Sequence, residues 1–235
     1  MRLVGLSELA RGTVIALALL LGSNAAYAAA DYGSSVDAAL HIDTITYIDA
    51  FGDLMLSSDD DVFIDEFVTG ASSFTPDALV EACFGLPGGC VYSAGYAAST
   101  GGEAYSTVES LSYLALSNAS SEATLEIALS LDYVLDAFTL VDDPLSSALA
   151  SAALELDVDG SVTSYSVLAS STTGPDSAGL ADSLAFMLTL APGESALISL
   201  AATSSGELTV VPVPAALPLS PTRLVGLVGI ARRRA

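Results

Sequence analysis

The stretch Ala123-Thr-Leu-Glu-Ile-Ala-Leu-Ser-Leu-Asp-Tyr-Val-Leu-Asp136 decides the fold class of this chain. Large apolar side chains occupy its odd positions: Leu125, Ile127, Leu129, Leu131, Tyr133 and Leu135. Small or polar side chains occupy the even positions, and Val134 is the exception. A period of two predicts a strand with one buried face and one wet face. Antiparallel sheets produce this pattern, whereas buried parallel strands are apolar on both faces.

The same alternation recurs further along the chain. Residues 154–158 alternate and end in Asp159-Gly160, a favoured two-residue hairpin turn, so we expect a return strand over 162–168. Residues 184–190 alternate again and lead into Ala191-Pro-Gly-Glu194, whose Pro-Gly pair suits a type II turn. The strands expected after this turn are a returning one over 195–201 and a last edge strand over 207–211.

The segment before the alternating stretch predicts mixed local structure. Residues 41–48 and 62–68 are rich in β-branched and aromatic side chains and predict strands, with a turn or loop over 57–61. Residues 75–83 predict a short helix, because Thr75 suits the N-cap and Pro76 the first helical position.

One segment is ambiguous. Residues 145–153 follow Asp143-Pro144 and predict either a helix capped by Asp143 or a loop that runs into the strand at Leu154. We favour the loop and strand. Closely spaced strands without a βαβ rhythm predict an all-β domain over residues 31–210, an antiparallel, jelly-roll-like β-sandwich with one short helix.

The charge of this domain has one sign. All six basic residues are Arg near the two ends of the chain, and of 28 acids only Glu8 precedes Asp31. Between Asp31 and Thr222 there is no Lys or Arg, so we expect this part to repel nucleic acid and anionic lipid headgroups. We interpret the acids as a solvated surface that keeps the domain soluble. Specific cation binding is the alternative, with Asp157 and Asp159 as weak calcium candidates and no other cofactor expected.

The chain has two cysteines, Cys83 and Cys90, on either side of Phe-Gly-Leu-Pro-Gly-Gly. In an exported protein a close pair across a turn predicts a disulfide.

The N-terminus has the features of a secretory signal peptide, residues 1–28, expected to form a signal helix. Arg2 and Arg11 supply the positive region, and residues 13–21 supply a short apolar run. Ala26 and Ala28 are the small residues that signal peptidase reads, so we expect cleavage after Ala28.

Residues 211–235 differ in composition from the acidic domain before them. Val211, Pro212, Val213, Pro214 and Ala215 open this stretch, a mainly apolar segment over 215–231 follows, and Arg232, Arg233 and Arg234 lie close to its end. This order resembles the PEP-CTERM sorting tail of exported Gram-negative proteins, in its V-P-x-P-A variant. The tail differs from that pattern where residues 220–223, Ser-Pro-Thr-Arg, interrupt the apolar segment.

The resemblance implies export, a transient inner-membrane anchor with a transmembrane tail, and processing by an exosortase. The Arg cluster would be the stop signal that keeps the C-terminus cytoplasmic. Such proteins reach the cell surface or are released, often in bacteria that make exopolysaccharide. Signal peptidase and exosortase are therefore the expected processing partners.

The domain itself shows no catalytic constellation. His41 is the only His, and no Gly-x-Ser-x-Gly elbow surrounds a Ser. We therefore expect a non-enzymatic surface or matrix protein. A carbohydrate-binding module associated with exopolysaccharide is the alternative, because β-sandwiches commonly bind glycans through aromatic side chains. A glycoside-acting enzyme is the third reading, because paired carboxylates can serve glycoside hydrolysis.

Overall fold

A computed structural model describes residues 30–49, 52–81, 88–142 and 145–211. These residues form ten strands, and the described part of the chain contains no helix. The strands are β1 (Ala30–Ile48), β2 (Leu54–Val68), β3 (Ser72–Glu81), β4 (Gly88–Ser99), β5 (Gly102–Asn118), β6 (Thr124–Val141), β7 (Ser147–Val158), β8 (Ser161–Ser171), β9 (Gly174–Leu190) and β10 (Ser195–Val210).

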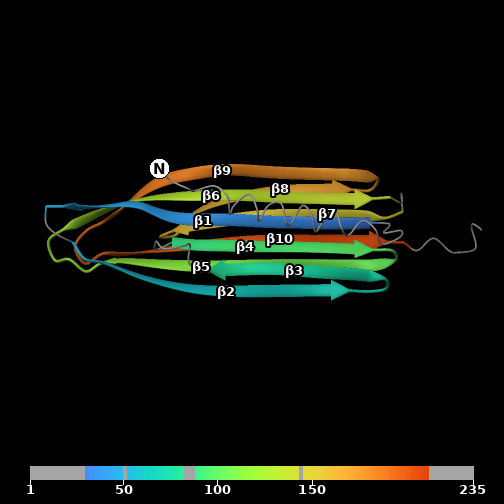
Figure 1. Ribbon diagram of the computed structural model, residues 1–235, viewed down its shortest axis with the longest axis horizontal. Helices are drawn as coiled ribbons and strands as arrows, with labels where there is room; N and C mark the ends of the chain where they lie inside the picture. The colour runs from blue at the N-terminus through green and yellow to red at the C-terminus, as the bar shows by residue number, and fades with distance from the viewer. Residues whose placement is uncertain (1–29, 50–51, 82–87, 143–144, 212–235) are drawn as a thin grey trace, which may run out of the picture.

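Two five-stranded antiparallel sheets pack face to face, which confirms the predicted all-β sandwich. Sheet I has the order β3-β4-β1-β6-β9, and sheet II has the order β2-β5-β10-β7-β8 (Figure 1). Hairpins join neighbouring strands at β3–β4 and β7–β8, whereas the other successive strands lie in different sheets. Each sheet is therefore assembled from segments that lie far apart in the sequence.

The alternating stretch that predicted the fold lies in β6, next to the central strand of sheet I. Its odd residues face the other sheet, and Leu125, Ile127, Leu131 and Leu135 have no exposed surface. They pack against apolar residues of β7 and β10, including Leu154 and Leu200. Each such side chain gains about 1.5–3 kcal/mol on burial.

Buried hydroxyls separate this large apolar cluster from a smaller one built mainly of Ala. Tyr32 Oη lies 2.5 Å from Ser106 Oγ, and Ser34 Oγ lies 2.6 Å from Ser204 Oγ. These bonds join β1 of sheet I to β5 and β10 of sheet II. They fix how the sheets lie on one another, because a buried hydroxyl without a partner would cost about 1–3 kcal/mol.

The predicted helix over residues 75–83 is wrong. As far as Glu81 these residues belong to β3, an edge strand paired with β4. Phe74, Pro76 and Ala78 are half-buried whereas Thr75 and Asp77 are exposed, so the segment has the period of a strand. Pro76 is tolerated because an edge strand need not donate every backbone N–H. The N-cap signature is local, and pairing with β4 outweighs it.

Two other local predictions are wrong. Residues 57–61 are not a turn but part of β2, where Asp59, Asp60 and Asp61 pair with β5 at the edge of sheet II. Their carboxylates are tolerated in a strand because an edge leaves them in water. Residues 207–210 are not an edge strand but the end of β10, which lies between β5 and β7.

The turns predicted at Asp159-Gly160 and at residues 191–194 are confirmed. Asp159 and Gly160 have φ values of 52° and 83°, as a type I′ hairpin requires, and join β7 to β8. Glu194 N donates to Ala191 O at 3.0 Å, and Gly193 has a φ of 78°. This second turn nevertheless leads β10 into the other sheet, not back along β9. The strand at Leu154 is confirmed, but most of the loop favoured over residues 145–153 is wrong, because β7 already begins at Ser147.

The predictions for the two ends lie outside the described residues. They concern the signal peptide with Ala26 and Ala28, the tail from Pro212 onward and the Arg cluster 232–234. Cys83 is also outside, so its pairing with Cys90 of β4 stays a prediction. No helix with the length and hydropathy needed to span a membrane occurs in the described segments.

Candidate functional site

The two calcium candidates, Asp157 and Asp159, lie at the β7–β8 turn and accept hydrogen bonds from backbone N–H groups. Asp157 Oδ1 accepts a hydrogen bond from Gly160 N at 2.7 Å, and Asp159 Oδ1 accepts one from Leu197 N at 3.1 Å. Each carboxylate therefore has a structural partner in the backbone. Across residues 30–49, 52–81, 88–142 and 145–211, no three or more His, Cys, Asp or Glu side chains are grouped so that they could hold a metal ion.

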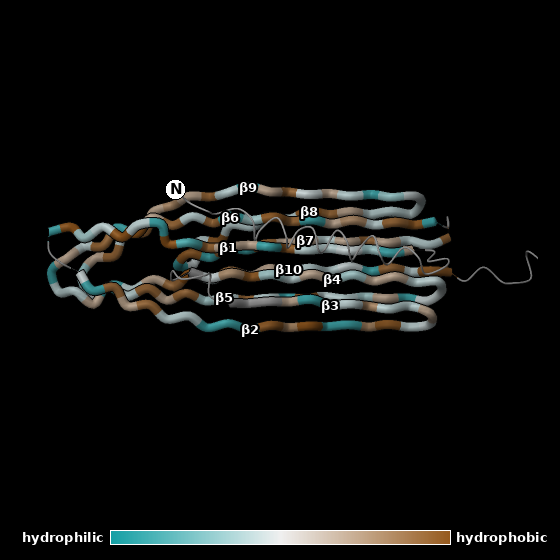
Figure 2. Tube along the Cα trace, viewed as in Figure 1, coloured by the Kyte–Doolittle hydropathy of each residue, from teal (hydrophilic) through white to brown (hydrophobic). Residues whose placement is uncertain are grey.

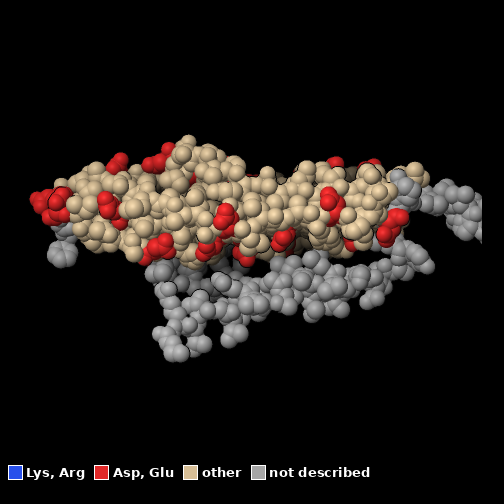
Figure 3. All heavy atoms as spheres, turned by 90° about the horizontal axis from the view of Figure 1, so that it is seen from above, with Lys and Arg blue, Asp and Glu red and all other residues tan. Residues whose placement is uncertain are grey.

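Acids are scattered over the surface of the sandwich. In the view of Figure 3 carboxylates mark the whole length of the molecule, and no Lys or Arg is seen among the coloured residues. The described segments contain neither residue, so no acid among them is neutralised by a Lys or Arg of the same part. The net charge of this part of the chain is therefore negative, and its electrostatic potential disfavours anions.

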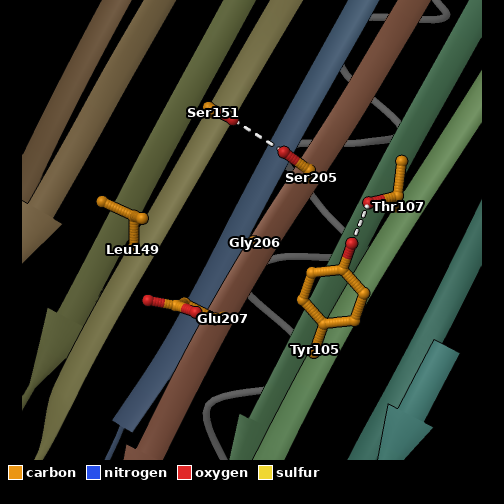
Figure 4. A pocket seen from close by; sticks show the side chains of 7 residues that line it. All are labelled: Tyr105, Thr107, Leu149, Ser151, Ser205, Gly206 and Glu207. Atoms are coloured by element: carbon orange, nitrogen blue, oxygen red, sulfur yellow. Dashed lines mark hydrogen bonds between the residues drawn. The ribbon is translucent and has the colours of Figure 1, made fainter.

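A hollow of about 110 Å³ lies on the outer face of sheet II. It combines an aromatic ring, hydroxyl groups, one carboxylate and one aliphatic side chain. Figure 4 shows the lining residues, which are Tyr105, Thr107, Leu149, Ser151, Ser205, Gly206 and Glu207.

Strand register places these residues together. Glu207 of β10 lies opposite Tyr105 of β5 and opposite Leu149 of β7. In the next row of that face, Ser205 lies opposite Thr107 and Ser151. Residues directly opposite one another on neighbouring strands share a face and have Cβ atoms about 4.5–5.5 Å apart. Two rows on three strands therefore form the hollow.

Hydrogen bonds hold the hydroxyl groups of the lining. Tyr105 Oη lies 3.0 Å from Thr107 Oγ1, and Ser151 Oγ lies 2.7 Å from Ser205 Oγ (Figure 4). Each pair keeps further donor or acceptor capacity for a ligand, because a hydroxyl both donates and accepts. The Glu207 side chain is exposed and adds acceptors.

A buried tyrosine lies beneath the hollow. Beneath Gly206 lies the buried ring of Tyr32. Burial raises the pKa of Tyr32 to about 12, the hydrogen bond with Ser106 opposes this rise, and the nearby Tyr105 and Glu207 add to it. Tyr32 therefore stays a neutral hydroxyl at physiological pH and carries no charge beneath the hollow.

Exposed aromatic rings continue the face toward the sheet edge. Phe67 of β2 lies opposite Tyr105, and Phe63 lies four residues away on the same face. Their exposed fractions are 56% and 58%, and that of Tyr105 is 42%. Figure 2 shows strongly hydrophobic segments along β2, although this strand is at the edge of the sandwich.

A second group of aromatic and acidic residues lies on the outer face of sheet I. Gly33 lies opposite both Tyr96 and Phe138, whose rings stack with centroids 6.3 Å apart. Beside them, burial and the charge of Asp142 raise the pKa of Asp31 to about 6, and a hydrogen bond with Tyr96 partly opposes this rise. This group offers a titratable carboxyl but lacks the hydroxyl rows of the hollow, so we take the hollow as the candidate site.

No residue of the hollow was singled out from the sequence. Its lining comes from residues 105–107, 149–151 and 205–207, which meet only through strand pairing. His41, the only His, lies in β1 of sheet I, whereas the hollow lies on sheet II.

Comparisons with known proteins identify no family for this chain. No protein-family model matches the chain, and no curated protein matches it.

Proposed function

We propose that the protein is an exported, non-enzymatic surface or matrix protein that is sorted through its PEP-CTERM-like tail by an exosortase. Support comes from the order of the sequence features: a signal peptide at residues 1–28, an acidic domain, a V-P-x-P-A motif from Val211 and a terminal Arg cluster. The tail would anchor the chain in the inner membrane until processing. The mature protein would then reach the cell surface or the medium.

Intact mass of the protein recovered from its native host tests the sorting. We expect the mature chain to lack residues 1–28 and the segment after about Pro214, and to retain the tail in a host without its exosortase. Added glycan mass would indicate attachment at the surface. A mature chain that retains Arg232 to Ala235 would contradict the sorting proposal.

We further propose that the domain binds polysaccharide through the hollow on sheet II. The observation that supports this is the row of Tyr105, Glu207 and Leu149 above the hydroxyls of Thr107, Ser151 and Ser205. A sugar presents an apolar ring face together with a rim of hydroxyl groups. An aromatic ring or an aliphatic side chain can pack against the apolar face of the sugar, and hydroxyls with a carboxylate can form hydrogen bonds with its hydroxyl groups. We expect no chemistry on the bound glycan and no cofactor.

Replacement of Tyr105 by Ala tests this binding. We expect the dissociation constant for a polysaccharide retained by the wild type to rise about tenfold or more, as truncation of a central aromatic contact does in other interfaces. The measurement is glycan-array binding followed by calorimetry, with analysis of the sugar for hydrolysis.

The matched control is Tyr113→Ala. Tyr113 lies on the same strand and the same face, is 36% exposed, and does not line the hollow. Its replacement should leave binding unchanged. Equal losses in both variants would show that the hollow is not the site, and released sugar would favour a glycoside-acting enzyme instead.

A further inference from the structure

The hollow is one part of a longer path across sheet II. A second hollow of about 140 Å³ shares Leu149 and Glu207 with the first and extends to Ser170 and Ser171 of β8. On the other side, Tyr105 leads to Phe67 of β2. The path therefore crosses all five strands, which at four strand spacings is roughly 19 Å. A ligand that uses the whole path is an elongated chain lying perpendicular to the strands.

Charge along this path indicates what kind of chain fits. Glu207 lies in the central row, and exposed carboxylates flank it on the same face: Glu103 two residues before Tyr105, and Asp65 two residues before Phe67. Since the described segments contain no Lys or Arg, nothing in them offsets these charges. An anionic chain would be repelled, and a chain carrying ammonium groups would be attracted.

Aromatic rings along the path also favour a cationic ligand. A cation over the face of an exposed Tyr or Phe gains about 0.5–1 kcal/mol. Tyr105 and Phe67 lie beside carboxylates along the path, and carboxylates form the stronger, charge-assisted hydrogen bonds with ammonium groups. Rings and carboxylates thus select the same ligand chemistry.

We propose that the polysaccharide bound across sheet II is an amino-sugar chain with free ammonium groups. It lies over Phe67, Tyr105 and Glu207 and continues toward Ser170. This inference rests on the proposed glycan binding and specifies its ligand.

Two matched probes test the ligand chemistry: a β-1,4-linked glucosamine hexamer and the same hexamer fully N-acetylated. Binding to the mature protein is measured by calorimetry at a mildly acidic pH at which the sugar amines are protonated. We expect the hexamer with free amines to bind about tenfold more tightly, which is the value of roughly one exposed charge-assisted hydrogen bond. The preference should shrink between about 0.05 M and about 0.5 M salt, because exposed charges are screened.

Two charge-neutralising variants test whether the preference for the hexamer with free amines depends on Glu207. Glu207→Gln should reduce it severalfold. Glu155→Gln removes the same charge from an exposed position on the same face, beyond the hollow on β7, and should leave the preference unchanged. Equal losses in both variants would show diffuse attraction by the acidic surface and would overturn the assignment to this path.

The remaining outcomes separate this inference from the proposed function. If the acetylated hexamer binds equally well or better, and Tyr105→Ala weakens it, the ligand is an uncharged glycan and the ammonium inference is wrong. If neither hexamer nor any other polysaccharide binds, polysaccharide binding itself is wrong.

Discussion

Asn118→Asp should be among the most damaging single-atom changes in this protein. Asn118 ends β5 with no exposed surface, and the two N–H groups of its Nδ2 are shared among three carbonyl oxygens: Ala123 O at 2.8 Å, Leu190 O at 3.0 Å and Ala191 O at 3.0 Å. The side chain thereby ties the connection before β6 to the end of β9. Aspartate has the same shape but would place a carboxylate oxygen against these acceptors.

We expect the free energy of unfolding at pH 7 to fall by about 3 kcal/mol or more. One oxygen of the buried carboxylate would keep Ser120 N as its donor, at 3.1 Å, but the other oxygen would face carbonyl acceptors in place of donors. Urea denaturation at pH 7 and at acidic pH measures the loss. Burial raises the pKa of such a carboxyl, so its protonated form persists to higher pH in the folded state than in the unfolded state. The deficit relative to wild type should therefore shrink as the pH falls and grow as it rises.

Ser117→Asp is the control for added charge. Ser117 is the preceding residue on the outer face of sheet II, half-buried and bonded to the exposed Ser195 hydroxyl at 2.9 Å. A carboxylate there reaches water, so we expect a loss below about 1 kcal/mol. If both variants lose equal stability, the net charge of the acidic domain and not the Asn118 network is responsible.

The fold was predictable where one face of a strand is buried throughout. The alternation of residues 123–136 marks β6 because an inner strand of a sandwich buries one face along its whole length. The same logic fails at the edges. β2 is exposed along nearly its whole length, so its sequence has no alternation to detect, and its run of Asp at 59–61 has the composition of a turn. Whether such a segment forms a strand depends on the strand with which it pairs.

The candidate site was not predictable for a related reason. Tyr105, Ser151 and Glu207 occupy outward positions on three strands, and outward positions tolerate any polar residue. Nothing in their local sequence differs from other outward positions. Only the register of β10 with β5 and β7 brings them into two adjoining rows, and register depends on contacts between segments more than forty residues apart.

Gly206→Ala should destabilise the sandwich beneath the hollow. A Cβ at this position of β10 would overlap Cε2 and Cδ2 of the Tyr32 ring and lie 2.7 Å from its Cζ. Tyr32 is fully buried and bonded to Ser106, so its ring has no free space to enter. We expect the free energy of unfolding to fall by about 1–3 kcal/mol, the usual cost of overpacking a core. Chemical denaturation of wild type and variant measures the difference.

A double-mutant cycle with Tyr32→Ala identifies the cause. Tyr32→Ala alone leaves a cavity and is destabilising. It should cost less in the Gly206→Ala background, because there it also removes the overlap, so the two changes are coupled. Gly179→Ala on edge strand β9 is the matched control, since its nearest neighbour is Asp136 Oδ1 at 2.8 Å, the end of an exposed side chain that can swing away. Additive effects of Gly206→Ala and Tyr32→Ala, or an equal loss at Gly179, would contradict the proposed close packing.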